Sequence, residues 1–529
     1  MKYQWNKIIV FSLFISLLFS FNCQAQKNKS IIISSKESIH IDSTQYYQES
    51  YRPQFHFTPE KKWMNDPNGL LYYKGTYHLF YQYYPENIVW GPMHWGHATS
   101  KDLIHWKHQK IALFPDELGL IFSGSAVMDV NNTSGLGTKE NPPMIAIFTY
   151  HNMEFEKAGK INMQSQGLAY SLDEGITWKK YEGNPIIGNA TMRDFRDPKV
   201  FWNEEAKIWN LVLVAGDRAQ FYTSNNLINW NLESEFGQNR GAHGGVWECP
   251  DLFKIKVNGT QEKKWVLSVS INPGAPNGGS ATQYFVGDFD GKAFSTSQKE
   301  TKWIDYGTDN YAGVTYNDAP NGDRIFIGWM SNWNYARNTP TTNWRSAMTL
   351  PRTLSIAKIK EDYVLQSQPL EQFNKLLTTD FSKEKIEIKK GEKKSFVYSN
   401  LNQSQIKFQS QNKDLKLVFS NEANDSLVLH YNAKKQLFSI DRRHSGKVNF
   451  EKSFGEKIHT TPTTNLISKS IDFQVILDWS SIEIFLNNGV YTFTEQIFPN
   501  QPYNKLSILS IDNQEIKRLT IDSVKRIWQ

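Results

Sequence analysis

The sequence predicts an all-β protein, a five-bladed β-propeller followed by a C-terminal β-sandwich. Short apolar and aromatic runs such as MIAIFTY and WVLSVSI recur between Gly, Asn, Asp and Pro, as is typical of hairpin strands of about five to eight residues. A motif of Ser, an Asp or Asn turn and Trp closes at Trp106, Trp178 and Trp230, and repetition at this spacing is typical of propeller blades. After Leu365 Trp becomes rare and alternating strands follow one another, which favours a sandwich.

The first 25 residues have the pattern of a secretory signal peptide. Lys2 and Lys7 flank a polar start, Ile8–Phe21 is almost wholly apolar, and small residues lead to Ala25. An apolar run of about 14 residues is too short to span a bilayer comfortably. We therefore expect a protein exported to the periplasm, the cell surface or the medium, with no integral membrane span.

The two cysteines, Cys23 and Cys249, exclude an internal disulfide framework, because the first lies in or beside the predicted signal. Cys23 could instead carry a lipid anchor, although the Ser-Phe-Asn before it matches that kind of processing poorly. Residues 26–51 are polar and Ser-rich, and we predict them to be a linker.

The propeller is expected over residues 52–357, because about 300 residues of such units make around five blades. The chain has 17 Trp, 24 Tyr and 32 Phe, which suits a β-rich protein with exposed stacking platforms, and sugar binding is one use of such platforms. A net charge of +6 that is scattered along the chain argues against a nucleic-acid partner. The composition therefore permits a carbohydrate-active protein.

The sandwich is expected over residues 365–529. Its acids include Asp441, Asp478 and Glu483, which lie in alternating strands. An outward face explains such acids, and we assign them no chemistry.

Three acids stand in similar contexts: Asp66 in WMNDPNG, Asp197 in FRDPKVFW and Glu248 in GGVWECPDLF. Proline after an aspartate restricts that residue to extended backbone, so Asp66 and Asp197 should be held rigidly. For Asp66 a tight turn with a solvated aspartate is the alternative. Glu248 lies between Trp247 and Cys249, and desolvation there should raise its pKa so that it can donate a proton near neutral pH.

Separate blades can bring these acids to one pocket, because the inner strands of a propeller converge on its axis. Two carboxyls about 5 to 5.5 Å apart across a glycosidic bond support a retaining double displacement. The third acid and Arg196 would then hold substrate hydroxyls. A surface ion pair between Arg196 and Asp197 is the alternative.

The stretches WMNDPNG, FSGS (residues 122–125), RDP and WECPDLF, in this order, resemble glycoside hydrolase family 32, the β-fructofuranosidases. The resemblance covers nearly the whole mature chain, including SIDRRHSG and DWSSIEIFLNNG in the sandwich. Further stretches, NPGAPNGGSATQYFVGDFDG, DYGTDNYAG and GWMSNWNYA, resemble the exo-acting fructan hydrolases of that family. The resemblance implies that Asp66 is the nucleophile, that Glu248 is the general acid and base, and that Asp197 holds ring hydroxyls and stabilises the transition state.

The same resemblance implies a substrate-binding set and a substrate class. The set comprises Trp63, Asn65, Gln82, Trp90, Phe122, Ser123, Arg196 and Trp333. The chain has Tyr84 where the family commonly has asparagine. No metal or organic cofactor is implied. The expected activity is removal of terminal fructose from levan or inulin, with sucrose as a secondary substrate.

Other functions remain open at this point. The enzyme could be an invertase that acts mainly on sucrose, or the propeller could bind carbohydrate without catalysis, because a fold does not fix a function. A sialidase would need an arginine cluster and a tyrosine nucleophile, and no such cluster is evident. Closely spaced histidines, as in zinc sites, occur at His94, His97, His105 and His108, but the segment is predicted as two strands, from which one metal could not easily collect all four.

Overall fold

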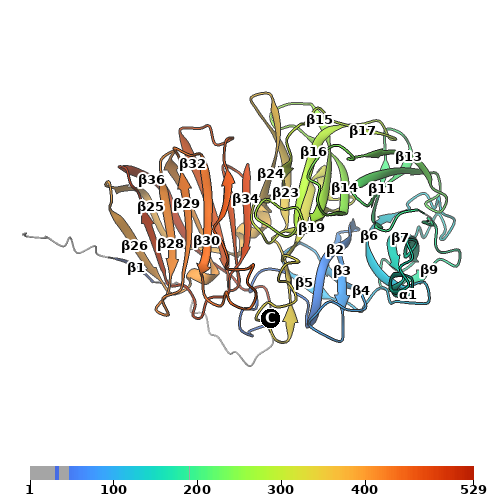
Figure 1. The fold of residues 1–529 in the computed structure, drawn as a ribbon, viewed down its shortest axis with the longest axis horizontal. Coiled ribbons are helices and arrows are strands. Elements are labelled where there is room, and N and C mark those ends of the chain that lie inside the picture. The colour runs from blue at the N-terminus through green and yellow to red at the C-terminus, as the bar shows by residue number, and fades with distance from the viewer. Residues whose placement is uncertain (1–29, 35–46, 190, 529) are drawn as a thin grey trace, which may run out of the picture.

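The computed structural model describes residues 30–34, 47–189 and 191–528, and this part of the chain is almost entirely β-structure. Two bodies lie side by side, a propeller and a sandwich (Figure 1). The helical elements in the described part are the α-helix α1 (Met153–Lys157) and the 3-10 turns η1 (Pro320–Gly322), η2 (Glu371–Leu376) and η3 (Leu401–Gln403). The predicted fold class is confirmed.

Five sheets form the five blades, and each blade follows the previous one along the chain. The first blade contains β2 (Lys62–Tyr73), β3 (Thr76–Tyr84), β4 (His94–Ser100) and β5 (Trp106–His108). The second contains β6 (Leu120–Met128), β7 (Met144–His151), β8 (Gln164–Ser171) and β9 (Lys179–Lys180). The third contains β10 (Phe195–Asn203), β11 (Ile208–Ala215), β12 (Arg218–Ser224) and β13 (Asn231–Phe236). The fourth contains β14 (Val246–Lys256), β15 (Lys263–Asn272), β16 (Ala281–Phe289), β17 (Phe294–Ser295) and β18 (Lys302–Trp303). The fifth contains β19 (Tyr311–Thr315), β20 (Arg324–Met330), β22 (Ala347–Met348), β23 (Arg352–Ile359) and β24 (Asp362–Pro369).

The ring closes through β21 (Trp344–Arg345), which pairs in parallel with β2 of the first blade. The innermost strands β2, β6, β10, β14 and β19 each contact the next around the ring. This arrangement brings the middle of each inner strand to the propeller axis.

The propeller extends further than the predicted limit at residue 357. β23 and β24 pair along their whole length, from Arg352 opposite Pro369 to Ile359 opposite Asp362. The limit at residue 357 falls just before the exposed tip of this hairpin, Lys360 and Glu361, and not at a domain boundary, whereas Val364 and Leu365 of β24 are buried. The sandwich accordingly begins after residue 369 and not at 365.

The Ser, Asp or Asn, Trp motif forms the same turn in the first three blades, between the third strand and the outermost one. In the first blade the Ser100 hydroxyl accepts the Leu103 N–H at 2.8 Å. In the third, the Asn226 side chain accepts the Asn229 N–H at 2.9 Å. Short polar side chains stabilise such turns by accepting backbone N–H groups, so the repeat does mark blades.

The sandwich consists of a seven-stranded and a six-stranded sheet around one large apolar core. The first sheet has the order β1 (Ile31–Ile33), β26 (Lys393–Tyr398), β35 (Lys505–Leu509), β28 (Leu415–Ser420), β29 (Ser426–Asn432), β30 (Leu437–His444) and β31 (His459–Pro462). The second has the order β25 (Leu377–Ile388), β36 (Gln514–Val524), β27 (Ser404–Gln411), β32 (Ser470–Asp478), β33 (Ser481–Leu486) and β34 (Tyr491–Gln496).

Residues 26–51 are not only a linker. Within the described part of that range, β1 adds a parallel edge strand to β26. Tyr47 is buried and stacks on Trp528 with 4.2 Å between ring centroids. Ile31–Ile33 is a run of only three isoleucines in a polar, Ser-rich stretch without a lasting period, so the sequence did not predict this strand.

The expectation that Asp478 and Glu483 face outward is wrong. Both are fully buried where the six-stranded sheet packs on the propeller, and His56 lies between them, with Nδ1 2.8 Å from Asp478 Oδ2 and Nε2 2.9 Å from Glu483 Oε2. Arg352 of the propeller donates to Glu483 as well. The alternation was interpreted correctly, but the outer face of this sheet is covered by the other domain. Asp441 is partly exposed and bonds Arg443.

In the described part of the chain, no helix is long and apolar enough to cross a membrane. The predicted signal peptide at residues 1–25 and the possible lipid anchor at Cys23 lie outside the described residues.

Candidate active site

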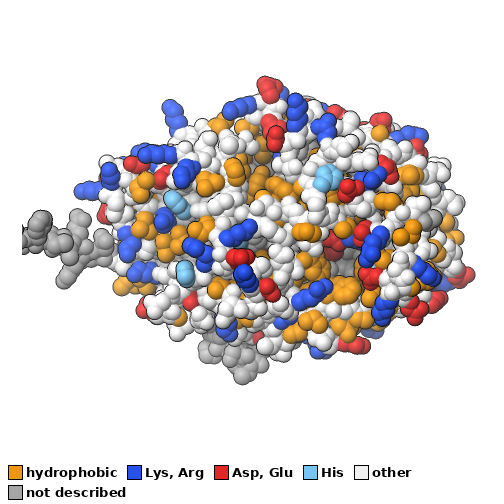
Figure 2. Space-filling model, viewed as in Figure 1, with side chains coloured by type: hydrophobic (Ala, Val, Ile, Leu, Met, Phe, Trp, Pro, Cys, Tyr) orange, Lys and Arg blue, Asp and Glu red, His pale blue; other side chains and the backbone are white. Residues whose placement is uncertain are grey.

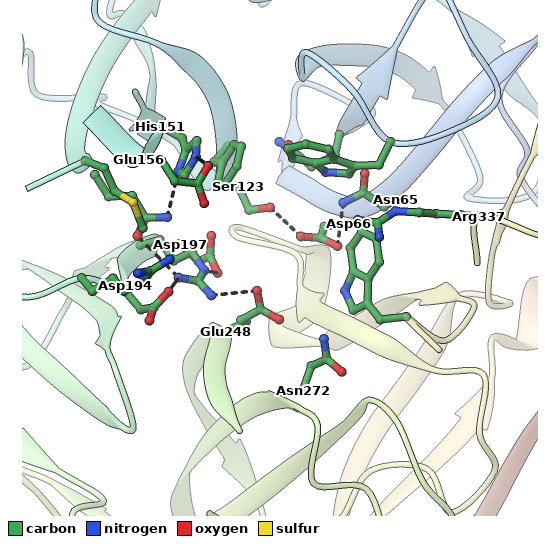
Figure 3. A pocket seen from close by; sticks show the side chains of 18 residues that line it. Asn65, Asp66, Ser123, His151, Glu156, Asp194, Asp197, Glu248, Asn272 and Arg337 are labelled. Atoms are coloured by element: carbon green, nitrogen blue, oxygen red, sulfur yellow. Dashed lines mark hydrogen bonds and ion pairs between the residues drawn. The ribbon is translucent and has the colours of Figure 1, made fainter. Parts of the chain in front are cut away.

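A cavity of about 510 Å³ opens at one end of the propeller axis. Figure 2 shows a hollow over the propeller half of the molecule, with acidic side chains beside it. Its lining comprises Asn65, Asp66, Gln82, Trp90, Phe122, Ser123, His151, Glu156, Met163, Gln164, Arg193, Asp194, Arg196, Asp197, Glu248, Asn272, Trp333 and Arg337. Asp66, Asp197 and Glu248 lie around this one cavity, although they come from three blades (Figure 3).

Every inner strand is irregular at the level of the cavity. The register shifts between Met64 and Pro67 in β2, Ile121 and Gly124 in β6, Arg196 and Lys199 in β10, Glu248 and Asp251 in β14, and Tyr311 and Val314 in β19. A bulge redirects a side chain out of the normal alternation, and it is also a place where a strand tolerates proline. Thus the prolines after Asp66, Asp197 and Cys249 mark bulges that turn functional side chains toward the axis.

Asp66 is held by three donors. Asn65 Nδ2 donates to Oδ1 at 3.0 Å and Ser123 Oγ donates to Oδ2 at 2.7 Å. The Cys249 thiol lies 3.5 Å from Oδ2. Burial raises the pKa of Asp66, and these hydrogen bonds oppose that effect by favouring the charged carboxylate. The solvated turn is therefore excluded for Asp66.

Glu248 faces Arg196 and Tyr311. Arg196 Nη2 donates to Glu248 Oε1 at 3.0 Å, and the Tyr311 hydroxyl donates to Oε2. Burial raises the pKa of Glu248 to about 7, with Arg196 opposing and the charges of Asp197 and Asp66 adding to the increase. This direction agrees with the predicted elevation of the Glu248 pKa, and the charged groups that act on Glu248 come from other blades.

Arg196 is buried, so its contact with Asp197 is not a surface ion pair. Its Nη1 donates to Asp194 at 2.7 Å, and its Nε lies 3.8 Å from Asp197 Oδ2. Burial alone would lower the pKa of Arg196, but the carboxylates of Glu248, Asp197 and Asp194 raise it. One permanent cation therefore faces three carboxylates, those of Asp194, Asp197 and Glu248.

Asp197 has a φ of 63°, and Cys249 has a φ of 45°. The expectation of extended backbone before proline is wrong for Asp197, because the bulge overrides the local preference. The Thr149 hydroxyl accepts the Asp197 N–H at 2.9 Å, and Asp197 Oδ2 accepts the Cys249 N–H at 2.9 Å. Burial raises the pKa of Asp197 to about 6, opposed by Arg196 and increased by the charge of Asp66.

Aromatic and amide side chains form the walls. Phe122 stacks on His151 with ring centroids 4.3 Å apart, and Trp90 meets Phe122 edge to face. Gln82 is buried, and its amide nitrogen has no hydrogen-bond partner among the described residues. Tyr84 points to Glu86. A donor without a partner beside a cavity is available to a ligand.

Trp63 does not line the cavity. It is fully buried, and its indole Nε1 donates to Asn65 Oδ1 at 2.8 Å. Its ring stacks on Trp333 with 6.0 Å between centroids. Trp63 therefore supports two lining residues from behind, whereas the other seven residues of the predicted substrate-binding set line the cavity.

Sequence reasoning gave no role to several side chains at the site, namely Tyr311, Asp194, Gln164, His151, Asn272 and Arg337. Asp194 stands two positions before Arg196, a spacing that could have indicated an ion pair. Tyr311 lies in DYGTDNYAG, but nothing local in that stretch connects its hydroxyl with Glu248, 63 positions away.

The four histidines have separate partners. His94 bonds the Pro92 carbonyl, His97 bonds His78, His105 bonds Asp102 and His108 bonds Tyr47. In the part of the chain that the structure describes, no group of three or more His, Cys, Asp or Glu side chains could hold a metal ion. The zinc alternative has no support in this arrangement.

A five-bladed propeller packed on a sandwich, with an axial cavity lined by three acids in different electrostatic settings, has the features of a glycoside hydrolase. The family model for the N-terminal domain of glycosyl hydrolases family 32 matches residues 56–369, and the model for the C-terminal part matches residues 372–523. The chain belongs to glycosyl hydrolases family 32.

Relatives with known activities support the same assignment. The levanase of Bacillus subtilis (strain 168) is 42% identical over 515 residues, covering 94% of this chain and 74% of that protein. The extracellular exo-inulinase of Aspergillus awamori is 40% identical over 489 residues, covering 86% of this chain and 90% of that protein. A crystal structure of exo-inulinase from the same fungus superposes with a TM-score of 0.85 at 36% identity, covering 91% of this chain and 100% of that one.

Proposed function

We propose that this chain is an exported, exo-acting β-fructosidase that removes terminal fructose from β-fructans such as levan or inulin, and also cleaves sucrose. The observation that carries the proposal is the contrast between two acids in one cavity. Burial raises the pKa of both acids, but three donors to Asp66 favour its charged form and oppose that rise, whereas the pKa of Glu248 reaches about 7. Two carboxyls in such different electrostatic settings can divide the roles of nucleophile and acid.

The proposed reaction is a retaining double displacement. Asp66 attacks the anomeric carbon of the terminal fructosyl unit while Glu248 protonates the leaving oxygen, which gives a covalent fructosyl-enzyme and the shortened chain. Glu248, now a carboxylate, takes a proton from water, whose oxygen attacks the anomeric carbon and releases Asp66. Asp197 and Arg196 would hold substrate hydroxyls and stabilise the positive charge that develops on the ring.

The local contacts suit these steps. The Tyr311 hydroxyl can donate to the Glu248 carboxylate or accept from the Glu248 carboxylic acid, so it can follow both protonation states. Arg196 keeps Glu248 from becoming permanently neutral, because its charge opposes the effect of burial. The resulting pKa near 7 lets one group act as acid and then as base.

Fructan as the main substrate is supported by the levanase and exo-inulinase relatives, which match along most of both chains. An invertase from Schizosaccharomyces pombe is 43% identical over 328 residues, which keeps an enzyme acting mainly on sucrose as the second candidate. Export is supported by the exo-inulinase relatives, whose names describe them as extracellular, and by the signal pattern of residues 1–25.

Time-resolved product analysis on levan, inulin and sucrose tests the proposal. Free fructose as the sole early product from levan or inulin is the expected result. Early release of mixed oligosaccharides would contradict exo action, and turnover of sucrose alone would favour the invertase. Carbon-13 NMR of C2 in the first product, recorded before mutarotation, distinguishes retention from inversion at the anomeric carbon. If the protein bound these sugars but released no product, the alternative of a carbohydrate-binding propeller without catalysis would be favoured.

A further inference from the structure

One wall of the cavity is an irregular segment, residues 331–338, that follows β20. Trp333 and Arg337 of this segment line the cavity. Two N–H groups, of Tyr335 and Ala336, donate to the Asn332 carbonyl at 3.1 and 2.9 Å, which closes a turn. The segment has no strand pairing, so its position depends on such local bonds and on side chains that reach it from elsewhere.

The sandwich reaches this segment through Arg442 of β30. The side chain of Arg442 is fully buried, and its Nη2 donates to the Tyr335 hydroxyl at 2.8 Å. The Tyr335 hydroxyl in turn donates to Asp309 Oδ1 at 2.7 Å. Tyr335 is thus clamped between the two domains, two positions from both Trp333 and Arg337.

The guanidinium has little freedom to move. Its Nη1 donates to Asp309 Oδ2 at 2.7 Å and lies 2.8 Å from Glu495 Oε2, while Nε donates to the Phe454 carbonyl at 3.0 Å. Its carbon centre lies 3.8 Å from the Phe454 ring centroid. A buried guanidinium that bonds in several directions at once is a rigid anchor.

We propose that Arg442 is a positioning residue that the sandwich contributes to the active site. Through the Tyr335 hydroxyl it holds residues 331–338 in the conformation that presents Trp333 and Arg337 to the sugar. The sandwich then sets the affinity of the cavity as well as the stability of the protein. This inference rests on the proposed fructosidase function.

The test compares Tyr335→Phe with a matched control in the same domain interface, Thr494→Val. The Thr494 hydroxyl accepts from Arg352 at 2.6 Å and donates to Asp305 Oδ2 at 2.6 Å, so both variants delete one buried hydroxyl that accepts from an arginine and donates to an aspartate. Thr494, Arg352 and Asp305 do not line the cavity. The Tm of both variants should therefore fall by a similar amount.

The readouts are the inhibition constant for free fructose and the separate values of KM and kcat on inulin. For Tyr335→Phe we expect the fructose constant and KM to rise roughly threefold to tenfold, with a much smaller change in kcat, as loss of one positioning hydrogen bond implies. Thr494→Val should keep the parent values. Arg442→Lys retains a charge for Asp309 and Glu495 but not the fork that reaches Tyr335, and it should show the same rise.

Parent values of the fructose constant and KM in Tyr335→Phe and Arg442→Lys would overturn the proposal, as would equal changes in Thr494→Val. If the parent protein released no fructose from any substrate, the proposed function itself would fail. Failure of the proposed function can be told apart from failure of the positioning role, because calorimetry still measures fructose binding by the parent protein and the variants.

Discussion

The Cys249 backbone N–H donates to Asp197 Oδ2 at 2.9 Å, and the Cys249 thiol lies 3.5 Å from Asp66 Oδ2. The residue that follows Glu248 therefore contacts the other two acids of the cavity. Burial and the nearby carboxylates raise the pKa of this thiol well above its usual value, so it remains a neutral donor. Three acids from three blades are thereby coupled through one bulge.

Removal of the Glu248 carboxyl should abolish turnover but not binding. Glu248→Ala and Glu248→Gln are expected to lower kcat by about two to four orders of magnitude, which is the usual contribution of general acid–base catalysis. Fructose binding measured by calorimetry should persist, because Arg196, Asp197 and the walls remain. Near-normal hydrolysis by either variant would show that another group donates the proton.

The pH profile should depend on the Arg196 charge. The proposed mechanism requires protonated Glu248, so kcat/KM should fall as the pH rises through about 7. Arg196 lowers the pKa of Glu248, and Arg196→Gln should therefore raise it and move the alkaline limb of the profile to higher pH. Loss of overall rate is expected as well, since Arg196 also lines the cavity. An unchanged alkaline limb would mean that another group titrates there.

The Tyr311 hydroxyl should contribute to kcat/KM, whereas the Tyr316 hydroxyl should not. Tyr311→Phe removes the donor to Glu248, and we expect kcat/KM to fall roughly tenfold to a hundredfold, as for a hydrogen bond to a charged group. Tyr316 is equally buried, and its hydroxyl has no partner among the described residues. Tyr316→Phe should keep full activity, and equal losses in the two variants would refute a specific role for Tyr311.

Gln82 should contribute to binding and not to folding. Because the structure gives its buried amide nitrogen no partner, Gln82→Leu is expected to leave the Tm unchanged or to raise it. If that nitrogen bonds the sugar, KM should rise about tenfold. Thermal unfolding and initial rates on sucrose check both parts. A lower Tm with an unchanged KM would assign Gln82 a structural role.

The interface between the domains should weaken at alkaline pH. Burial alone lowers the pKa of His56, but Asp478 and Glu483 outweigh it and raise the pKa to about 9. Stability from this group is fully present below the unfolded pKa of about 6.5 and is lost as the pH rises through about 9. The loss is on the order of 3 kcal/mol.

Thermal unfolding of the parent protein and of His56→Gln between pH 6 and pH 10 measures this dependence, over a range chosen to span roughly both pKa values. The parent should lose Tm over this range more steeply than the variant. Parallel curves would show that other groups cause the alkaline loss. Activity at pH 6 serves as the control for folding, because His56 does not line the cavity.

Much of the fold follows from local pattern. Strand runs, the repeated turn that closes at Trp106, Trp178 and Trp230, and the change of texture near Leu365 are each short-range features that strands and hairpins express directly. The boundary at 357 failed for the same reason, because an exposed hairpin tip and a domain linker have similar composition. The strand β1 was missed since parallel pairing with β26 leaves no local sign.

The site divides in a similar way. Asp66, Asp197 and Glu248 could be singled out as candidates from sequence because each stands beside a proline or just before a Cys-Pro pair, in stretches that resemble family 32, and these prolines mark bulges. The role of Arg196 was open between a surface pair and a functional group, and only burial decided it. The partners of Asp478 and Glu483 could not be predicted, since His56 is more than four hundred positions away.

The sequence by itself determined the strand content, the blade repeat and the identity of the acids, because these depend on neighbours along the chain. Only the tertiary structure decided which atoms meet, namely Arg196 and Tyr311 at Glu248, Cys249 at Asp66, and Arg442 at Tyr335. The physical reason is that burial and charge, which set pKa values and anchor loops, depend on distances in space. Closure of the ring and docking of the sandwich create those distances, and no local pattern encodes them.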